Sequence, residues 1–149
     1  MILNNFSLAG KTAIVTGSST GLGQGICLGM AEAGAKVVGV DYVDAPETAA
    51  MIKDIGGEYL GIKANLLTID PIQGIVDQAV EAFGSVDILV NNAGIIRRED
   101  SINFTEKDWD DVMNINIKTV FFFCQTAAKE FLKQGTGGKI INIASMLSF

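Results

Sequence analysis

Histidine is absent from the 149 residues of this chain, and its absence excludes several kinds of site. A Ser-His-Asp triad, a Cys-His nucleophile pair and a histidine-ligated metal centre each need a residue that the chain does not contain. Any acid–base chemistry must therefore use Tyr, Lys, Asp, Glu or Ser side chains. We expect no metal site.

Cysteine is also scarce, with one residue near each end of the chain. Cys27 and Cys124 lie in apolar segments and match no metal-binding or redox spacing. We interpret both as buried small hydrophobic residues of a protein from a reducing compartment.

Basic residues are outnumbered, with 11 Lys and Arg against 17 Asp and Glu and a net charge of −6. This balance argues against a nucleic-acid-binding protein, which would carry a basic face. The first residues lack the basic and then apolar pattern of a signal peptide, and no run of about 18 apolar residues is present to span a membrane. We therefore expect a cytoplasmic protein.

Proline occurs twice and glycine 17 times, a combination that is typical of tight turns in a regular fold. Short β-branched runs alternate with segments of helical periodicity. Within the third of these segments, Asp70 is the predicted N-cap before Pro71, and Thr105 opens a predicted capping box with Asp108 at the start of the fourth. The expected strands are residues 12–16, 36–41, 59–64, 86–90 and 139–144, and the expected helices are 21–33, 45–55, 70–83 and 105–133.

This alternation predicts an α/β fold with a doubly wound parallel sheet, the Rossmann fold, in a single domain. Such sheets bind ligands beyond the carboxyl ends of their strands. The loops that follow residues 16, 41, 64, 90 and 144 are therefore the candidate ligand-binding segments.

A glycine-rich loop follows the first strand, in the sequence Thr16-Gly17-Ser18-Ser19-Thr20-Gly21-Leu22-Gly23. Gly17 is expected to allow the turn out of the strand, Gly21 to let the backbone approach a pyrophosphate, and Gly23 to let the helix pack on the sheet. The helix N-terminus would add N–H groups and the positive end of its dipole. A purely structural turn is the alternative.

An acidic residue, Asp41, ends the second strand. A carboxylate at this point accepts hydrogen bonds from an adenosine ribose and repels a 2′-phosphate. Neither the glycine loop nor the residues directly after Asp41 include Arg or Lys, so NAD is favoured over NADP. The alternative is an ordinary loop aspartate.

Three further segments carry a family resemblance, namely Asn91-Asn92-Ala93-Gly94, Asn116 within Asn114–Lys118, and Ile140–Ser145. Together with the glycine loop they resemble the classical short-chain dehydrogenases/reductases, in the same order and over the whole chain. The resemblance implies catalytic roles for Ser145 and Asn116. It implies cofactor-binding roles for Gly17, Ser19, Gly21, Leu22, Gly23, Asp41, Asn65, Leu66, Asn92, Ala93 and Gly94.

The family resemblance implies a specific role for each of these polar residues. Ser145 would hydrogen-bond the reacting oxygen of the substrate, and Asn116 would hold a water molecule that links the catalytic lysine to solvent. Asn65 stands where the family usually has Asp near the adenine, and its side-chain oxygen can still accept from the adenine amino group. The Asn91–Gly94 turn would both tie neighbouring strands together and line the cofactor pocket.

The family's general base is a tyrosine with a lysine four residues later on a helix. Tyr59 and Lys63 have this spacing, but they lie in an expected strand, where residues four apart are about 13 Å distant. Tyr42 has Pro46 at that offset. We therefore predict that residues 1–149 are the N-terminal NAD-binding part of one dehydrogenase domain, truncated after its fifth strand. The alternative is a catalytically inactive nucleotide-binding fragment with an apolar strand edge that favours association.

Arg97 and Arg98 follow the fourth strand, so one of them is a candidate partner for a substrate carboxylate. Two solvated loop arginines are the alternative. The segment from Asn91 to Asp100 resembles family members that oxidise a secondary alcohol of a deoxy sugar acid. The resemblance also implies a homo-oligomer, commonly a tetramer, with the helix around residues 108–133 at an interface. A methyltransferase would explain Asp41 but not the Asn91–Gly94 turn or Ser145.

Overall fold

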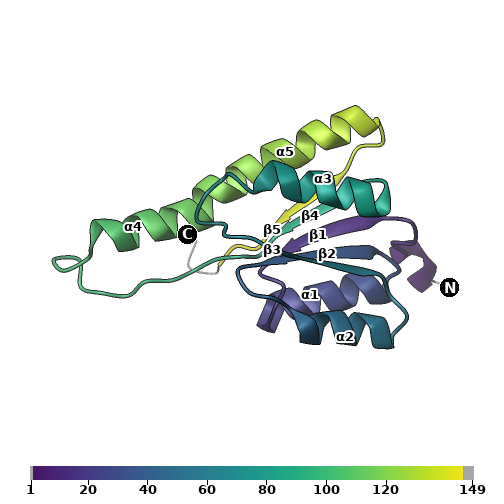
Figure 1. Cartoon of the computed structure of the whole chain (residues 1–149), viewed down its shortest axis with the longest axis horizontal. Helices are drawn as coiled ribbons and strands as arrows, with labels where there is room; N and C mark the ends of the chain where they lie inside the picture. Colours follow the sequence, from purple (N-terminus) through teal and green to yellow (C-terminus); the bar gives the residue numbers. More distant parts are fainter. Residues whose placement is uncertain (1, 146–149) are drawn as a thin grey trace.

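Five parallel strands form one sheet in the order β3-β2-β1-β4-β5, in a computed structural model that describes residues 2–145 (Figure 1). The predicted α/β fold with a parallel sheet is confirmed. The strands are β1 (Thr12–Thr16), β2 (Lys36–Asp41), β3 (Tyr59–Lys63), β4 (Ile88–Asn91) and β5 (Lys139–Asn142). The helices are a 3₁₀ turn η1 (Ile2–Phe6), α1 (Gly21–Glu32), α2 (Pro46–Asp54), α3 (Ile72–Phe83), α4 (Glu106–Met113) and α5 (Thr119–Gln134), with a π-helical segment η2 (Asn114–Lys118) between the last two.

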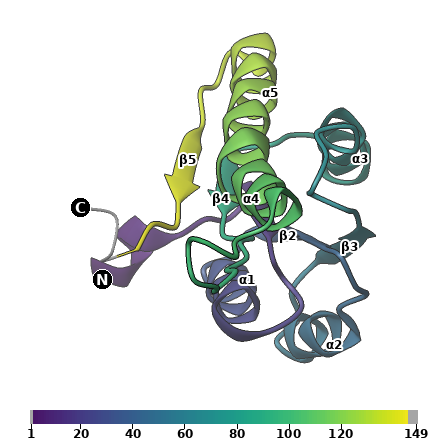
Figure 2. The same cartoon turned by 90° about the vertical axis from the view of Figure 1, so that its left-hand side faces the viewer.

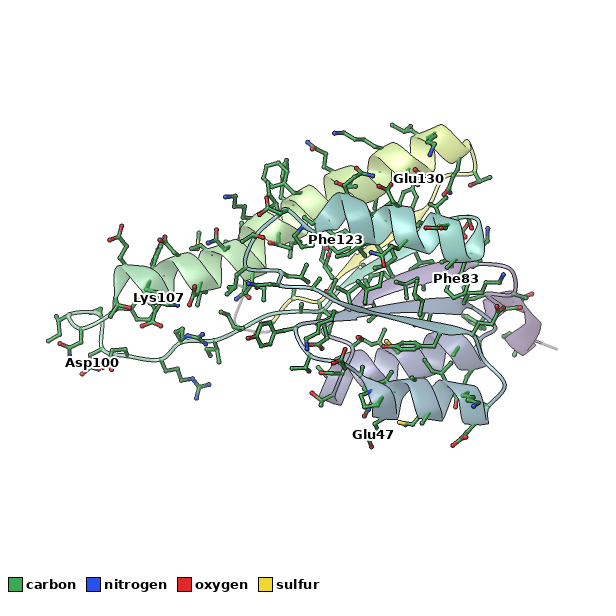
Figure 3. All side chains as sticks on the ribbon, viewed as in Figure 1. Glu47, Phe83, Asp100, Lys107, Phe123 and Glu130 are labelled. Carbon is green, nitrogen blue, oxygen red and sulfur yellow. The ribbon has the colours of Figure 1, made fainter. Side chains whose placement is uncertain are left out.

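Helices cover both faces of the sheet: α1 and α2 lie on one face, and α3 and α5 lie on the other (Figure 2). The β1 side chains alternate accordingly, because Ala13 and Val15 pack with Cys27 of α1 while Ile14 packs with α3 and α5. Phe123 of α5, labelled in Figure 3, is fully buried in the apolar core between the sheet and helices α3 and α5. Burial on both faces explains why these strands are continuous apolar runs.

The chain reverses its direction across the sheet at β1. It runs outward from β1 through β2 to β3, and then crosses back so that β4 pairs with β1 and β5 pairs with β4. The carboxyl ends of β1 and β4 therefore flank the switch point at which such sheets bind ligands. The glycine loop and the Asn91–Gly94 turn leave the sheet at this point.

The outer strand β5 is much less covered than the central strands. Within residues 2–145 it pairs with β4 alone, and Ile140, Ile141 and Ile143 are 37%, 40% and 44% exposed. Apolar strand edges of this kind favour association with another chain or segment. Self-association of the chain through this edge remains a prediction.

The predicted continuous helix over residues 105–133 is wrong in one respect. The π-helical segment Asn114–Lys118 separates α4 from α5, and α5 ends at Gln134. A single π turn shifts the spacing of apolar residues by too little to be detected in the sequence. Such turns often occur at functional sites. The predicted cap is confirmed, since the Thr105 hydroxyl accepts a hydrogen bond from the Asp108 N–H at 3.1 Å.

Two other local predictions are also wrong. Asp70 is not the N-cap of α3, because Ile69–Ile72 form a tight turn closed by the Ile72 N–H and the Ile69 carbonyl, which leaves Pro71 at the cap. Cys27 is fully buried, and burial raises the pKa of its thiol to about 12, but Cys124 is only half-buried. Cys124 lies beside β5, where part of the surface is open.

The apolar residues of the long helical stretch are not all core residues. Phe123 is fully buried, whereas Trp109 and Phe121 are 59% and 61% exposed. Across residues 2–145, no helix has both the length and the hydropathy that a membrane-spanning segment requires.

Asp87, just before β4, fastens two strands together at the amino end of the sheet. Its carboxylate accepts hydrogen bonds from the Thr12 N–H at 3.0 Å, the Ser85 hydroxyl at 2.9 Å and the Lys11 ammonium at 3.1 Å. Burial alone would raise the pKa of Asp87, but these hydrogen bonds and the Lys11 charge together lower it. The ionised carboxylate therefore stabilises the fold.

Asp87→Asn is expected to lower the free energy of unfolding by about 1–2 kcal/mol at pH 7. Because the folded-state pKa is depressed, this stabilisation is complete above the unfolded-state pKa near 3.9 and is lost as the pH falls through the folded-state value. Urea denaturation at several pH values should show the gap between the two proteins closing below about pH 4. Exposed Glu81→Gln is the control, and a gap independent of pH would contradict the role of the charge.

Candidate cofactor and active site

The glycine loop between β1 and α1 is packed too closely for side chains at two of its three glycines. A Cβ atom on Gly23 would overlap the Gly17 carbonyl oxygen and lie 2.6 Å from Asn92 Nδ2. A Cβ on Gly17, where φ is +71°, would lie 2.8 Å from the same Asn92 atom. Gly21 also has positive φ (+57°), but no other atom would lie within 4 Å of its Cβ, so this part of the loop faces open space.

Thr16 at the end of β1 holds the glycine loop against the Asn91–Gly94 turn. Its hydroxyl oxygen accepts from the backbone N–H groups of Asn92 and Ala93 at 3.0 and 2.9 Å. The Asn92 amide in turn donates to the carbonyls of Thr16 and Gly17 at 3.0 and 3.4 Å. The role of Thr16 could not be predicted from sequence, where its one signal is a hydroxyl directly before the first loop glycine.

Asn91 connects the other side of the turn to β5 and α5. Its amide donates to the Asn142 side-chain oxygen at 2.9 Å and to the Cys124 sulfur at 3.3 Å. The amides of Asn91 and Asn92 therefore tie β4 to both of its neighbouring strands, as predicted for this turn.

A cavity of about 440 Å³, here called the glycine-loop cavity, opens at the carboxyl ends of β1, β2 and β3. Gly21, Leu22 and Gly23 do not line it: Gly23 is buried behind the loop, and Leu22 is 76% exposed on α1. The predicted cofactor residues that do line it are Gly17, Ser19, Asp41, Asn65, Leu66, Asn92, Ala93 and Gly94.

Asp41 is held rigidly at the rim of the glycine-loop cavity. One carboxylate oxygen accepts from the Ser19 N–H at 2.9 Å and the other from the Tyr42 N–H at 2.7 Å. Each oxygen retains a second lone pair for another donor. The carboxylate therefore joins the glycine loop to the end of β2 and fixes a negative charge beside the cavity.

The third strand supplies the opposite wall through Asn65 and Leu66. The Asn65 side-chain oxygen already accepts from the Leu67 N–H at 3.0 Å, which leaves one lone pair available to a ligand. The buried Thr119 hydroxyl donates to the Leu66 carbonyl at 2.7 Å and so fixes this wall from the start of α5. No local pattern in the sequence indicates this role of Thr119.

A second cavity of about 580 Å³ contains both predicted catalytic residues, Asn116 and Ser145, and is called the serine cavity here. Asn116 lies in the π-helical segment, where its oxygen accepts from the Ile95 N–H and its amide donates to the Ile95 carbonyl, both at 2.9 Å. The two cavities share residues 92–95. A ligand that spans this shared wall would reach from Asp41 to the region of Ser145.

The two arginines after β4 differ in position. Arg97 lines the glycine-loop cavity, but its guanidinium also pairs with Asp108 at 3.3 Å and Asp111 at 3.9 Å on α4. Arg98 is exposed. A role of Arg97 in binding a substrate carboxylate would therefore compete with these two aspartates.

Tyr59 and Lys63 lie in β3, as expected, and do not share a helix. The Tyr59 ring packs over Gly39 of β2, where a side chain would overlap the phenol oxygen. This contact gives Tyr59 a packing role at the opposite side of β2 from the serine cavity.

Residues 11–149 match the family model for short chain dehydrogenases. The chain belongs to the short-chain dehydrogenase family. It is 60% identical over all 149 residues to 2-dehydro-3-deoxy-D-gluconate 5-dehydrogenase of Escherichia coli, and 59% identical over the same length to the enzyme of that name from Dickeya dadantii. In both comparisons the whole chain covers 59% of the relative, so the chain spans less than two thirds of the proteins it matches.

A solved structure of a related protein has the same fold. A protein from Agrobacterium tumefaciens, assigned as a 2-deoxy-D-gluconate 3-dehydrogenase and crystallised with NADP, is 48% identical with a TM-score of 0.86. The match covers 97% of this chain and 56% of that one. Because that protein binds NADP, the likeness does not favour NAD over NADP.

Proposed function

We propose that these residues form the cofactor-binding part of an NAD-dependent dehydrogenase that acts on a secondary alcohol or ketone of a deoxy sugar acid, of the 2-dehydro-3-deoxy-D-gluconate or 2-deoxy-D-gluconate type. The main support for this proposal is that residues 92–95 line both the glycine-loop cavity, which contains Asp41, and the serine cavity, which contains Ser145. The names of the Escherichia coli and Agrobacterium relatives support the substrate class.

The glycine-loop cavity fits a dinucleotide on two counts. Gly17 lines it without a side chain, and Asp41 presents lone pairs for a ribose hydroxyl. Thr20 and Ser19 line the cavity without any basic side chain in the loop. Asp41 beside a loop without Arg or Lys supports NAD as the cofactor in preference to NADP.

The proposed chemistry divides between the bound cofactor and the protein. NAD supplies a nicotinamide ring that accepts or returns a hydride. Ser145 would donate a hydrogen bond to the reacting oxygen of the substrate, and Asn116, already fixed by Ile95, would hold the water that connects the base to solvent. By resemblance to the family, the proton of the alcohol passes to a tyrosine whose pKa is lowered by a lysine four residues later.

The 149 residues contain no such pair on a helix, since Tyr42 follows β2 and Tyr59 lies within β3. This observation favours a second candidate function for the polypeptide of these residues alone, namely nucleotide binding without catalysis. By resemblance, we also propose that the whole protein is a homo-oligomer, with the exposed Trp109 and Phe121 available at the interface.

Titration of the 149-residue polypeptide with NAD and NADP, followed by calorimetry, tests the proposed cofactor role. NAD is expected to bind at least about tenfold more tightly than NADP, because the 2′-phosphate carries close to two negative charges and would face the Asp41 carboxylate. Asp41→Asn should narrow this ratio. Equal affinities for the two nucleotides would contradict the NAD preference, and no binding of either would contradict the cofactor role.

A further inference from the structure

Asp41 also lines another cavity, which is separate from the glycine-loop cavity and the serine cavity. It has a volume of about 300 Å³ and is called the side cavity here; Ser18, Asp41, Asp44, Tyr59 and Lys63 are among the residues that line it. Asp41 lines both the glycine-loop cavity and the side cavity, so its carboxylate stands between them. A group attached to a ribose held by Asp41 would have the side cavity within reach.

Two neighbouring strands contribute paired glycines to the lining of the side cavity. Gly39 of β2 is paired with Gly61 of β3, and Asp41 is paired with Lys63 two residues later. Paired residues of parallel strands point to the same face, so the carboxylate and the lysine stem start side by side at the end of this glycine-lined channel. The Tyr59 ring covers the other end of it.

Two of the residues that line the side cavity carry buried hydroxyl groups. The Ser18 hydroxyl and the Tyr59 hydroxyl are buried, and neither makes a hydrogen bond of ordinary length and angle to another group within residues 2–145. Burial raises the pKa of Tyr59, and the nearby Ser18 hydroxyl only partly offsets the increase, so the phenol stays protonated at neutral pH. Because both hydroxyl oxygens are buried, they do not contact an anion in the side cavity.

The charged side chains that line the side cavity disfavour an anion. Lys63 is the cation among the described residues that line it, and its ammonium lies 3.4 Å from the Asp44 carboxylate. The lining therefore contains one basic side chain and two acidic side chains, Asp41 and Asp44. A phosphate monoester, itself close to two negative charges at pH 7, would be repelled.

We propose that Asp44 is a second determinant of cofactor choice, which acts by occupying the lysine that would otherwise attract a 2′-phosphate into the side cavity. The proposal rests on the proposed nicotinamide-cofactor function. Asp41 opposes the phosphate directly, whereas Asp44 acts through Lys63. Because both members of the Lys63–Asp44 pair are largely exposed, the effect on binding is modest and depends on ionic strength.

Two adenosine fragments, 5′-AMP and adenosine 2′,5′-bisphosphate, isolate the effect of the phosphate. Asp44→Asn in the 149-residue polypeptide is expected to tighten binding of the bisphosphate by up to about fivefold, the range that an exposed charge pair allows, and to leave 5′-AMP within about twofold. Lys63→Met together with Asp44→Asn should abolish the gain. The gain should also decline as salt is raised from 50 to 500 mM, roughly with the Debye length.

The outcomes separate this proposal from the one on which it rests. Equal changes for both fragments in Asp44→Asn, or a gain that persists with Lys63→Met, would overturn the role of Asp44 while nucleotide binding stands. Failure of both fragments to bind the wild-type polypeptide and every variant, with circular dichroism showing a folded chain, would overturn the nucleotide site itself. Asp54→Asn, at the exposed end of α2 and outside the cavity lining, is the charge-matched control.

Discussion

A chimera that continues residue 149 with the unmatched C-terminal part of the Escherichia coli relative is expected to oxidise a deoxy sugar acid with NAD. The polypeptide of residues 1–149 is expected to show no turnover in the same NADH-production assay. By resemblance to the family, the added segment would supply the general base, whose loss alone costs about 10²–10⁴ in rate, and the wall that positions nicotinamide and substrate. The predicted difference in kcat/KM is therefore at least about 100-fold.

The chimera also tests the residues that this chain contributes. Ser145→Ala in the chimera should lower kcat by about 10²–10³-fold, as loss of one hydrogen-bond donor to a reacting oxygen does, with little change in the dissociation constant for NAD. Ser145→Thr keeps a hydroxyl and should retain part of the activity. Full activity of the alanine variant would contradict the proposed role of Ser145. Turnover by the 149-residue polypeptide at the rate of the chimera would contradict the prediction that residues 1–149 lack the general base.

The parts of the fold that could be predicted are those with a strong local signal. Thr12–Thr16 and Lys36–Asp41 match the predicted strands residue for residue, because each is a short apolar run that carries β-branched residues. Gly34 and Gly84 have positive φ directly after helices, where the sequence placed helix ends. Family motifs then located the loops that line the two cavities.

The parts that could not be predicted depend on contacts between distant residues. Thr16 bonds to backbone groups 76 and 77 residues away, and Thr119 reaches back 53 residues to Leu66, so no local pattern identifies their partners. The π-helical segment Asn114–Lys118 contains Asn116, whose side chain hydrogen-bonds both the backbone N–H and the backbone carbonyl of Ile95. This contact spans 21 residues and is not visible in the local sequence. The pairing of Arg97 with α4 likewise follows from tertiary packing.

Gly23→Ala is expected to damage both the fold and the cofactor site. Its Cβ would overlap the Gly17 carbonyl oxygen and lie 2.7 Å from the Gly17 carbonyl carbon, and neither backbone atom can rotate away as a side chain would. Either α1 or the glycine loop has to shift. We expect about 3 kcal/mol of destabilisation in urea denaturation, the upper end of the overpacking range, together with at least about tenfold weaker NAD binding.

Gly25→Ala is the matched control, because Gly25 lies two residues further along the same helix and no other atom would lie within 4 Å of its Cβ. A helix-interior alanine loses less backbone freedom on folding than glycine, so this variant should be about 0.5–1 kcal/mol more stable and bind NAD normally. The opposite signs at two glycines of one helix would show that Gly23 is required by its contact with the loop. Equal stability and equal NAD affinity in both variants would refute that requirement, and with it the close packing of α1 on the glycine loop.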